Sequence, residues 1–257
     1  MKIMTFNLKC DSPLYLNNRW DKRKHMVYDV MKNYDCDIIG TQEVKDNMLK
    51  DLKNNMDSHN IIGIQRCKKI SSERNNILIS KKYIIHEEKT FWLSENPEKI
   101  GSKKWYSFFP RICTTAIVEI NNTKIRICNT HLDHVLSKAR EFGLSTLMEI
   151  IEKEEKEEKL PMILMGDFNA TPDSKLIMDF IQGKFSNKKL KAVQEINKDL
   201  YKQATRDNFK RTEKGVHIDY IFVSEEIEVI NAEIINYNIN GKYPSDHYPL
   251  MAEVKIK

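Results

Sequence analysis

The sequence predicts an α/β protein in which two packed, largely antiparallel β-sheets are flanked by helices. A strand–helix–strand layout occurs twice, over residues 1–44 and 124–168, and such units place helices on the outer faces of sheets. The expected strands outnumber the helices, and many connections between them resemble hairpins. The chain has 257 residues with only 8 Gly and 7 Pro and no Pro/Gly/Ser-rich linker, so we expect one domain over residues 1–257.

Apolar periodicity predicts the elements in order along the chain. The first unit is expected as strand, helix and strand over residues 1–8, 19–34 and 36–44, and the second over residues 124–132, 138–159 and 161–168. Further strands are expected over residues 61–65, 76–80, 112–120, 217–224, 228–236 and 248–256, and a further helix over residues 174–182. The charged run over residues 152–159 is interpreted as the solvated end of the second helix.

Composition and charge exclude several classes of protein. Hydrophobic residues make up 40% and charged residues 31%, which excludes a disordered, collagen-like or membrane-spanning chain. A net charge of +5 permits an anionic substrate without requiring one. The 5 cysteines are widely spaced with no Cys-x-x-Cys pair, so a reducing cytoplasm is expected rather than a disulfide framework or a zinc cluster. The N-terminus begins a strand at once without a signal-peptide pattern, and no membrane partner is expected.

Polar side chains recur where the predicted strands end. They are Asn7, Glu43, His131, Asp167, Asn169, Asp219, Asp246 and His247. Each alone has a simpler interpretation: Asp and Asn favour turns, His131 with His134 could belong to a structural loop or a zinc fragment, and His247 could be a core histidine. Their coincidence in one chain favours a functional site, since ligands gather beyond the carboxyl ends of strands.

The types of these residues favour catalysis with a hard cation. The acidic and amide side chains supply oxygen ligands and no thiolate, which suits Mg²⁺, with Mn²⁺ able to substitute. Two histidines beside such a cation suit in-line displacement at phosphorus, because one can orient or activate water and the other can stabilise developing charge. The sequence therefore predicts metal-dependent chemistry on a phosphate ester.

Ordered motifs give the chain a family resemblance. They are Thr5-Phe6-Asn7, Thr41-Gln42-Glu43, Asn129-Thr130-His131-Leu132, Gly166-Asp167-Phe168-Asn169, Ile218-Asp219-Tyr220 and Ser245-Asp246-His247-Tyr248-Pro249. In this order they resemble the endonuclease/exonuclease/phosphatase superfamily, the DNase I-like metal-dependent phosphoesterases, over nearly the whole chain. The resemblance implies a four-layer α/β sandwich with the active site where the edge loops of the two sheets meet.

The resemblance also implies which residues hold the cation and the water. Glu43 would be the principal Mg²⁺ ligand, helped by Asn7 and Asp246. Asp167 and Asn169 would hold the attacking water and a phosphate oxygen, either directly or through a second cation.

The remaining roles concern the phosphate and the proton. The resemblance makes His247 a general base or phosphate stabiliser oriented by Asp219, and His131 a donor to a phosphate oxygen. Glu73 would pair with His131. Arg111 would lie near the scissile phosphate, although a surface arginine at the start of a strand is an equally good interpretation of that residue.

Several secondary motifs resemble a bacterial group related to the eukaryotic deadenylases, among them Asn18-Arg19-Trp20-Asp21 and His131-Leu132-Asp133-His134. The leading interpretation is a Mg²⁺-dependent phosphodiesterase that acts on nucleic acid, and a monomer is expected. One alternative is a phosphatase or diesterase for a small phosphorylated metabolite or lipid headgroup. The other is a non-catalytic binding protein on the same fold, since one fold hosts many functions.

Aromatic residues alternate with basic ones over residues 91–109. We expect this segment to flank the substrate entrance, where exposed rings can stack on bases. For any single ring, a place in the core is an alternative. The rings concerned are Phe91, Trp92, Trp105, Tyr106, Phe108 and Phe109.

Overall fold

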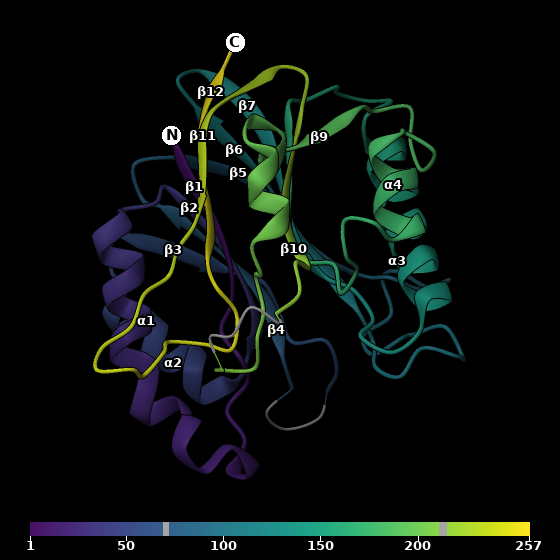
Figure 1. The fold of residues 1–257 in the computed structure, drawn as a ribbon. Coiled ribbons are helices and arrows are strands. Elements are labelled where there is room, and N and C mark those ends of the chain that lie inside the picture. The colour runs from purple at the N-terminus through teal and green to yellow at the C-terminus, as the bar shows by residue number, and fades with distance from the viewer. Residues whose placement is uncertain (69–71, 211–214) are drawn as a thin grey trace.

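The computed structural model describes residues 1–68, 72–210 and 215–257. The strands within these residues form two six-stranded β-sheets (Figure 1). The strand order of the first sheet is β11 (Ile227–Ile234), β12 (Leu250–Ile256), β1 (Lys2–Asn7), β2 (Ile38–Val44), β4 (Arg74–Ser80) and β3 (His59–Ile62). The order of the second is β5 (Ile84–Trp92), β6 (Ile112–Ile120), β7 (Thr123–His131), β8 (Met162–Asp167), β10 (Asp219–Ser224) and β9 (Leu190–Ala192).

Each sheet contains one parallel pair among its described strands. β1 pairs with β2 in parallel, and β7 pairs with β8 in parallel, whereas the other neighbours are antiparallel. Both parallel pairs belong to the strand–helix–strand units predicted from the sequence, because a crossover helix is what allows two successive strands to run in the same direction.

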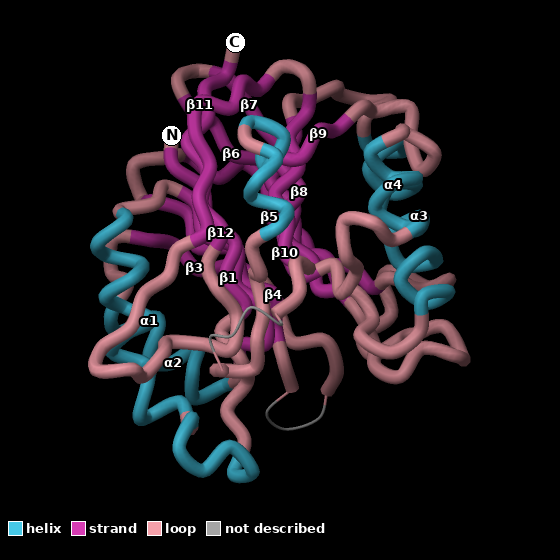
Figure 2. The backbone as a smooth tube through the Cα atoms, in the orientation of Figure 1, coloured by secondary structure: helices cyan, strands magenta, loops and turns pink. Residues whose placement is uncertain are grey.

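The helices lie on the outer faces of the two sheets. α1 (Trp20–Tyr34) and α2 (Asp46–Asn55) cover the first sheet, and α3 (Ser137–Glu154) and α4 (Lys175–Ile181) lie beside the second, on the opposite side of the molecule (Figure 2). Three short 3-10 helices complete the described elements: Pro13–Asn18, Val193–Ile196 and Lys198–Lys202. The four-layer α/β sandwich is therefore confirmed.

The side chains of each strand point alternately to its two faces, and this explains the layers. Ile38 and Ile163 belong to the cluster between the sheets, whereas their neighbours Ile39 and Leu164 pack under the helices of their own sheet. Successive side chains of a strand point to opposite faces, so a strand with apolar residues at every position is buried on both sides. Both sheets are consequently held in the middle of the molecule.

Several predicted elements differ in extent from those observed. α3 ends at Glu154 rather than at residue 159, because Ile151 is its last buried residue and the charged run beyond it has no apolar side to pack. α2, β5 and β9 were not predicted. β5 is an edge strand whose first residues are mostly exposed, so its apolar pattern is weak, and α2 is short and buries only Met48 and Leu52.

Two further observations bear on the expected class of protein. No helix in the described part of the chain is both long and apolar enough to traverse a lipid bilayer. All five cysteines have free thiols.

Candidate active site

The motif residues meet at one edge of the paired sheets. Asn7, His131 and Asp167 are the last residues of β1, β7 and β8. Asp219, by contrast, is the first residue of β10, not the last of a strand as we expected; because β10 is antiparallel to β8, Asp219 pairs with Asp167 in register. Asp246 and His247 likewise precede β12, which runs antiparallel to β1.

The backbone around this edge is strained. Lys9, Glu43 and Asn169 adopt positive φ angles of 54°, 63° and 49°. Such angles are uncommon for residues other than glycine, and they cluster at functional sites. Glu43 also lies in an irregularity of the β2–β4 pairing between Thr41 and Val44, which turns the chain out of the sheet.

A cavity of about 330 Å³ opens at this edge. It is lined by Lys9, Tyr15, Glu43, Arg66, Glu73, Phe109, Arg111, His131, His134, Asp167, Asn169, Arg206 and His247. Both basic and acidic side chains line the cavity, as expected of a site that binds an anionic group next to a cation.

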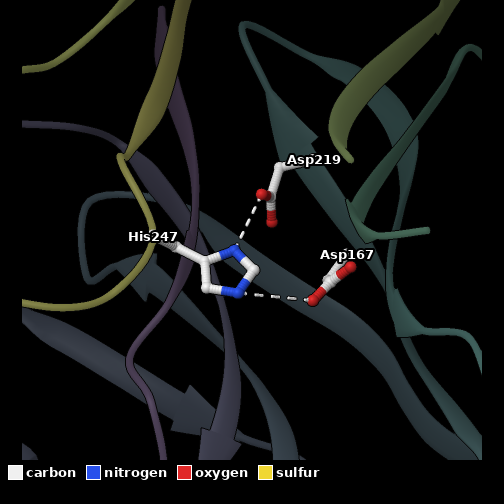
Figure 3. A group of neighbouring side chains, drawn as sticks. All are labelled: Asp167, Asp219 and His247. Atoms are coloured by element: carbon white, nitrogen blue, oxygen red, sulfur yellow. Dashed lines mark hydrogen bonds and ion pairs between the residues drawn. The ribbon is translucent and has the colours of Figure 1, made fainter. Parts of the chain in front are cut away.

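His247 is held between two carboxylates (Figure 3). Its Nδ1 lies 2.8 Å from Oδ2 of Asp219, and its Nε2 lies 3.7 Å from Oδ2 of Asp167. Burial alone would lower the pKa of His247, but the charges of Asp219, Asp246 and Asp167 and the hydrogen bond to Asp219 raise it to about 9. The imidazole is therefore largely protonated at neutral pH, which suits stabilisation of a phosphate.

The Asp167 carboxylate lies at the centre of the cluster. Its Oδ2 accepts a hydrogen bond from Nδ2 of Asn7 at 3.0 Å and lies 3.5 Å from Nε2 of His131, while Oδ1 accepts the backbone N–H of Asn169 at 2.9 Å. Burial and the neighbouring charge of Asp219 raise the pKa of Asp167 to about 7. A carboxylate with a pKa near neutrality is suited to take a proton from water.

His131 differs from His247 in its charge state. Its side chain is buried, and burial together with the positive charge of Arg111 lowers its pKa well below the usual value. A neutral imidazole still carries one N–H, which can donate to a phosphate oxygen.

Glu43 presents the best cation ligand among the expected ones. Its Oε1 accepts Nδ2 of Asn7 at 3.2 Å and its Oε2 accepts the backbone N–H of Cys10 at 2.8 Å, so each oxygen keeps a lone pair. Burial would raise the pKa of Glu43, but Lys9, His131 and these surroundings lower it, and the carboxylate is charged. This oxygen donor set fits a hard divalent cation.

Asp246 is already close to two cations of the chain. Its Oδ2 lies 3.2 Å from Nζ of Lys9 and 3.7 Å from Nε of Arg206. A cation bound at Glu43 would therefore compete with Lys9 for Asp246. A further grouping of possible ligands, Asp167, Asp219 and His247, has atoms within 4.8 Å of one another.

Two expected placements need correction. Glu73 lines the cavity but its Oε2 pairs with Nη1 of Arg66 at 2.9 Å, because Arg66 and Glu73 face each other across a backbone hydrogen bond; the expected pairing with His131 is not the contact it makes. Phe91 and Trp92 are buried in the core, at 0% and 2% exposure, and do not flank the entrance.

Two other rings of the aromatic segment do lie at the site: Phe109 lines the cavity, and the Phe108 ring lies 4.8 Å from that of Phe109 and 6.0 Å from that of His134. Phe108 is 62% exposed, and Trp105 is 83% exposed. Arg111 is buried, at 7% exposure, and lines the cavity, so it is not a surface arginine.

Four of the lining residues carry no motif that marks them in the sequence: Lys9, Tyr15, Arg66 and Arg206. Lys9 follows β1, Tyr15 lies in the 3-10 helix Pro13–Asn18, Arg66 precedes β4 and Arg206 precedes β10. Lys9 could have been found from its place two residues after Asn7. Arg66 and Arg206 carry no local signal, because only the packing of distant loops brings them to the cavity.

The fold and this cluster of carboxylates, histidines and guanidinium groups define a hydrolase of phosphate esters. The model of the Endonuclease/Exonuclease/phosphatase family matches residues 4–247, and the chain belongs to this family. The family generally uses a divalent metal. No curated protein matches the sequence.

Similar solved structures agree with this assignment. An endonuclease/exonuclease/phosphatase from Bacteroides vulgatus is 28% identical, with a TM-score of 0.89 over 100% of this chain and 98% of that one. A mannosyl-6-phosphatase from Bacteroides thetaiotaomicron is 26% identical, with a TM-score of 0.88 over 100% of both chains. The human Nocturnin catalytic domain is 16% identical, with a TM-score of 0.77 over 100% of this chain and 94% of that one, and shares the fold.

Proposed function

We propose that this chain hydrolyses a phosphate ester by in-line attack of water within the cavity. The observation that carries the proposal is the position of Asp167, whose Oδ2 lies within 3.7 Å of the Nε2 atoms of both His131 and His247. A carboxylate with a pKa of about 7 and two imidazole N–H groups therefore converge on one small volume. This combination supplies a base for water and donors for the phosphate.

Each side chain has a task that its surroundings support. Asp167, held by Asn7 and the Asn169 backbone, accepts the proton of the attacking water. His247, charged at neutral pH through its bond to Asp219, stabilises the negative charge that develops on the phosphate oxygens. Asn169 and Arg111 line the same cavity and bind further phosphate oxygens.

Mg²⁺, or Mn²⁺ in its place, would be held by Glu43 with Asn7 and Asp246 near it, and when bound would supply a positive charge for the phosphate. The Lys9 ammonium group, whose Nζ lies 3.2 Å from Oδ2 of Asp246, lowers the pKa of Glu43 and so helps to keep that carboxylate ionised.

Two substrate classes are candidates. A small phosphorylated metabolite suits the size of the cavity, and the name of the mannosyl-6-phosphatase relative supports a phosphate ester of this kind. A nucleic acid is favoured by the exposed Trp105 and Phe108, which offer rings for base stacking. We expect a monomer that acts in a reducing cytoplasm without a membrane partner.

Substrate turnover tests the proposal. Purified protein is assayed with RNA, DNA, mannose 6-phosphate and nitrophenyl esters, in Mg²⁺, in Mn²⁺ and in chelator. Metal-dependent hydrolysis that is lost in Asp167→Asn is the expected result. If the folded protein hydrolyses none of these in any metal, the chain is better described as a non-catalytic binding protein on this fold.

A further inference from the structure

Two guanidinium groups form one wall of the cavity. Arg66 and Arg111 both line it, and the positive charge of each contributes to the lowered pKa of His131. Burial and the charge of Arg66 lower the pKa of Arg111 to about 10. The two groups are therefore near one another and near the histidine expected to contact the phosphate.

Aromatic rings fix both groups. The guanidinium carbon of Arg66 lies 4.6 Å from the ring centre of Phe109, and the His134 ring stacks on Phe109 at 5.9 Å and 18°. Nδ1 of His134 in turn accepts a hydrogen bond from Nη2 of Arg111 at 2.9 Å. Arg66, Phe109, His134 and Arg111 are thus linked in a continuous chain of contacts.

The backbone of Arg66 is held as well. Its carbonyl oxygen accepts the indole N–H of Trp92 at 2.6 Å, and its N–H donates to the carbonyl of Glu73 at 2.9 Å. The buried Trp92 therefore supports the site from the core, although it does not face the entrance. Little reorganisation is needed before an anion binds, which favours affinity.

The wall has more positive than negative charge. Glu73 pairs with Arg66 at 2.9 Å, whereas no carboxylate pairs with Arg111 among the residues that the structure describes. The Nε atom of Arg111 is buried and makes no hydrogen bond within the same residues. A buried donor left without a partner is costly, so this N–H is suited to an acceptor that arrives with the ligand.

We propose that Arg66 and Arg111 bind non-bridging oxygens of a terminal phosphate group, so that the preferred substrate is a phosphomonoester rather than a diester. This inference rests on the proposed function and deepens it. A monoester offers three non-bridging oxygens and two negative charges, which two guanidinium groups can bind through paired hydrogen bonds. A diester has one charge and would direct its second ester group against this charged wall.

Hydrolysis of the monoester breaks one P–O bond and forms another. The oxygen of water forms the new bond to phosphorus and gives a proton to Asp167, while the bond from phosphorus to the ester oxygen breaks. The electron pair of that bond leaves on the ester oxygen, which takes up one proton in place of the one that the water has lost. The products are an alcohol and inorganic phosphate.

Two substrates with the same leaving group test the inference. They are p-nitrophenyl phosphate and methyl p-nitrophenyl phosphate, a monoester and a diester, assayed with the full chain in Mg²⁺. For the wild type we expect kcat/KM to be at least roughly tenfold higher for the monoester, as one extra charge-assisted contact would give. Arg66→Gln and Arg111→Gln are expected to lower kcat/KM for the monoester by roughly 10- to 100-fold, mainly through KM, and to affect the diester much less.

His134 is a positioning residue in this scheme. His134→Gln keeps an acceptor for Arg111 and is expected to retain a low KM for the monoester, whereas His134→Leu is expected to raise it. Lys191→Gln, at an exposed position on the far edge strand β9, serves as the control and is expected to match the wild type.

A second measurement is independent of turnover. In chelator, calorimetry is expected to give tighter binding of inorganic phosphate than of dimethyl phosphate, and this difference is expected to shrink in Arg66→Gln.

Each contrary outcome has a defined meaning. A wild type that prefers the diester, or variants that lose both substrates equally, would overturn the monoester inference while leaving phosphate-ester hydrolysis intact. If the wild type hydrolyses neither ester, both the proposed function and the monoester inference are wrong. If Arg111→Gln does not fold, the substrate preferences of the wild type and of the Arg66→Gln variant still test the monoester inference.

Discussion

Nδ1 of His247 lies 2.8 Å from Oδ2 of Asp219, and this bond joins the loop before β12 of one sheet to the first residue of β10 in the other. The site is therefore completed only when the two sheets pack. The bond also fixes the imidazole so that its Nε2 faces Asp167 (Figure 3).

The first prediction follows from this bond. If Asp219 acts through His247, the two residues form one unit, and substitutions in such a unit are not additive. Asp219→Asn and His247→Ala are each expected to lower kcat by about 10³- to 10⁴-fold, by analogy with catalytic triads. The double variant should be scarcely worse than His247→Ala. If steady-state kinetics shows that the losses of the two single variants multiply in the double variant, Asp219 has a separate role.

Glu43 provides a prediction about the cation. Glu43→Gln preserves the shape of the side chain but removes the charge that Lys9 and His131 face, so hydrolysis is expected to be lost at low Mg²⁺. Calorimetric titration with Mn²⁺ is expected to show weaker binding, while the midpoint of thermal unfolding in chelator changes little. Full activity of this variant at low Mg²⁺ would show that the cation is held elsewhere.

The raised pKa of His247 has a consequence for stability. Because its pKa is about 9 in the folded chain and near 6.5 when unfolded, protonation stabilises the fold fully below about pH 6.5. This contribution, on the order of 3 kcal/mol, is lost as the pH rises toward 9.

Denaturant unfolding in chelator measures this effect. The free energy of unfolding of the wild type should exceed that of His247→Gln most at pH 6, and the difference should narrow steadily up to pH 9. A difference that is constant across this range would contradict the assigned pKa.

The sequence motifs predicted the carboxylates and histidines of the site better than the other residues that line the cavity. Asn7, Glu43, Asp167 and His247 are recognisable because each sits at the end of an apolar strand or next to one. Asp219 was expected where a strand ends but begins β10, because local sequence could not show that β10 runs antiparallel to β8. The relative direction of two strands follows from the hydrogen bonds between them, which is a long-range property.

Burial of the aromatic segment was not predictable for a similar reason. Phe91 and Trp92 end the edge strand β5, which pairs with β6, whereas Trp105 and Phe108 belong to a loop, yet all four rings occur in similar polar surroundings in the sequence. Phe91 is buried because it packs in the cluster that includes residues of α3, which is a contact between distant parts of the chain.

Trp105 tests the nucleic-acid alternative. Its ring is 83% exposed, so Trp105→Ala removes little packing but would remove a stacking surface worth about 1–3 kcal/mol per base. Hydrolysis of a single-stranded oligonucleotide is then expected to fall by roughly 5- to 100-fold, with little change for methyl p-nitrophenyl phosphate. Phe108→Leu, which stays apolar but cannot stack, provides a second variant. Equal effects on both substrates would argue against base stacking here.

The last prediction concerns Gly166, the residue before Asp167 in β8. Its φ of 144° is rarely adopted by other residues, and a Cβ added there would lie 1.9 Å from the carbonyl oxygen of Thr130, its partner in β7. Backbone, not a flexible side chain, occupies that space, so the parallel β7–β8 pair would have to separate where it carries His131 and Asp167. Gly166→Ala is therefore expected to destabilise the fold by at least about 3 kcal/mol in denaturant unfolding. Gly241→Ala is the matched control: Gly241 also has a positive φ, 72°, but nothing lies within 4 Å of its added Cβ, so only the cost of the backbone angle, about 1 kcal/mol, is expected. If the two variants lose equal stability, the close approach of β7 and β8 at Gly166 is not what requires glycine there.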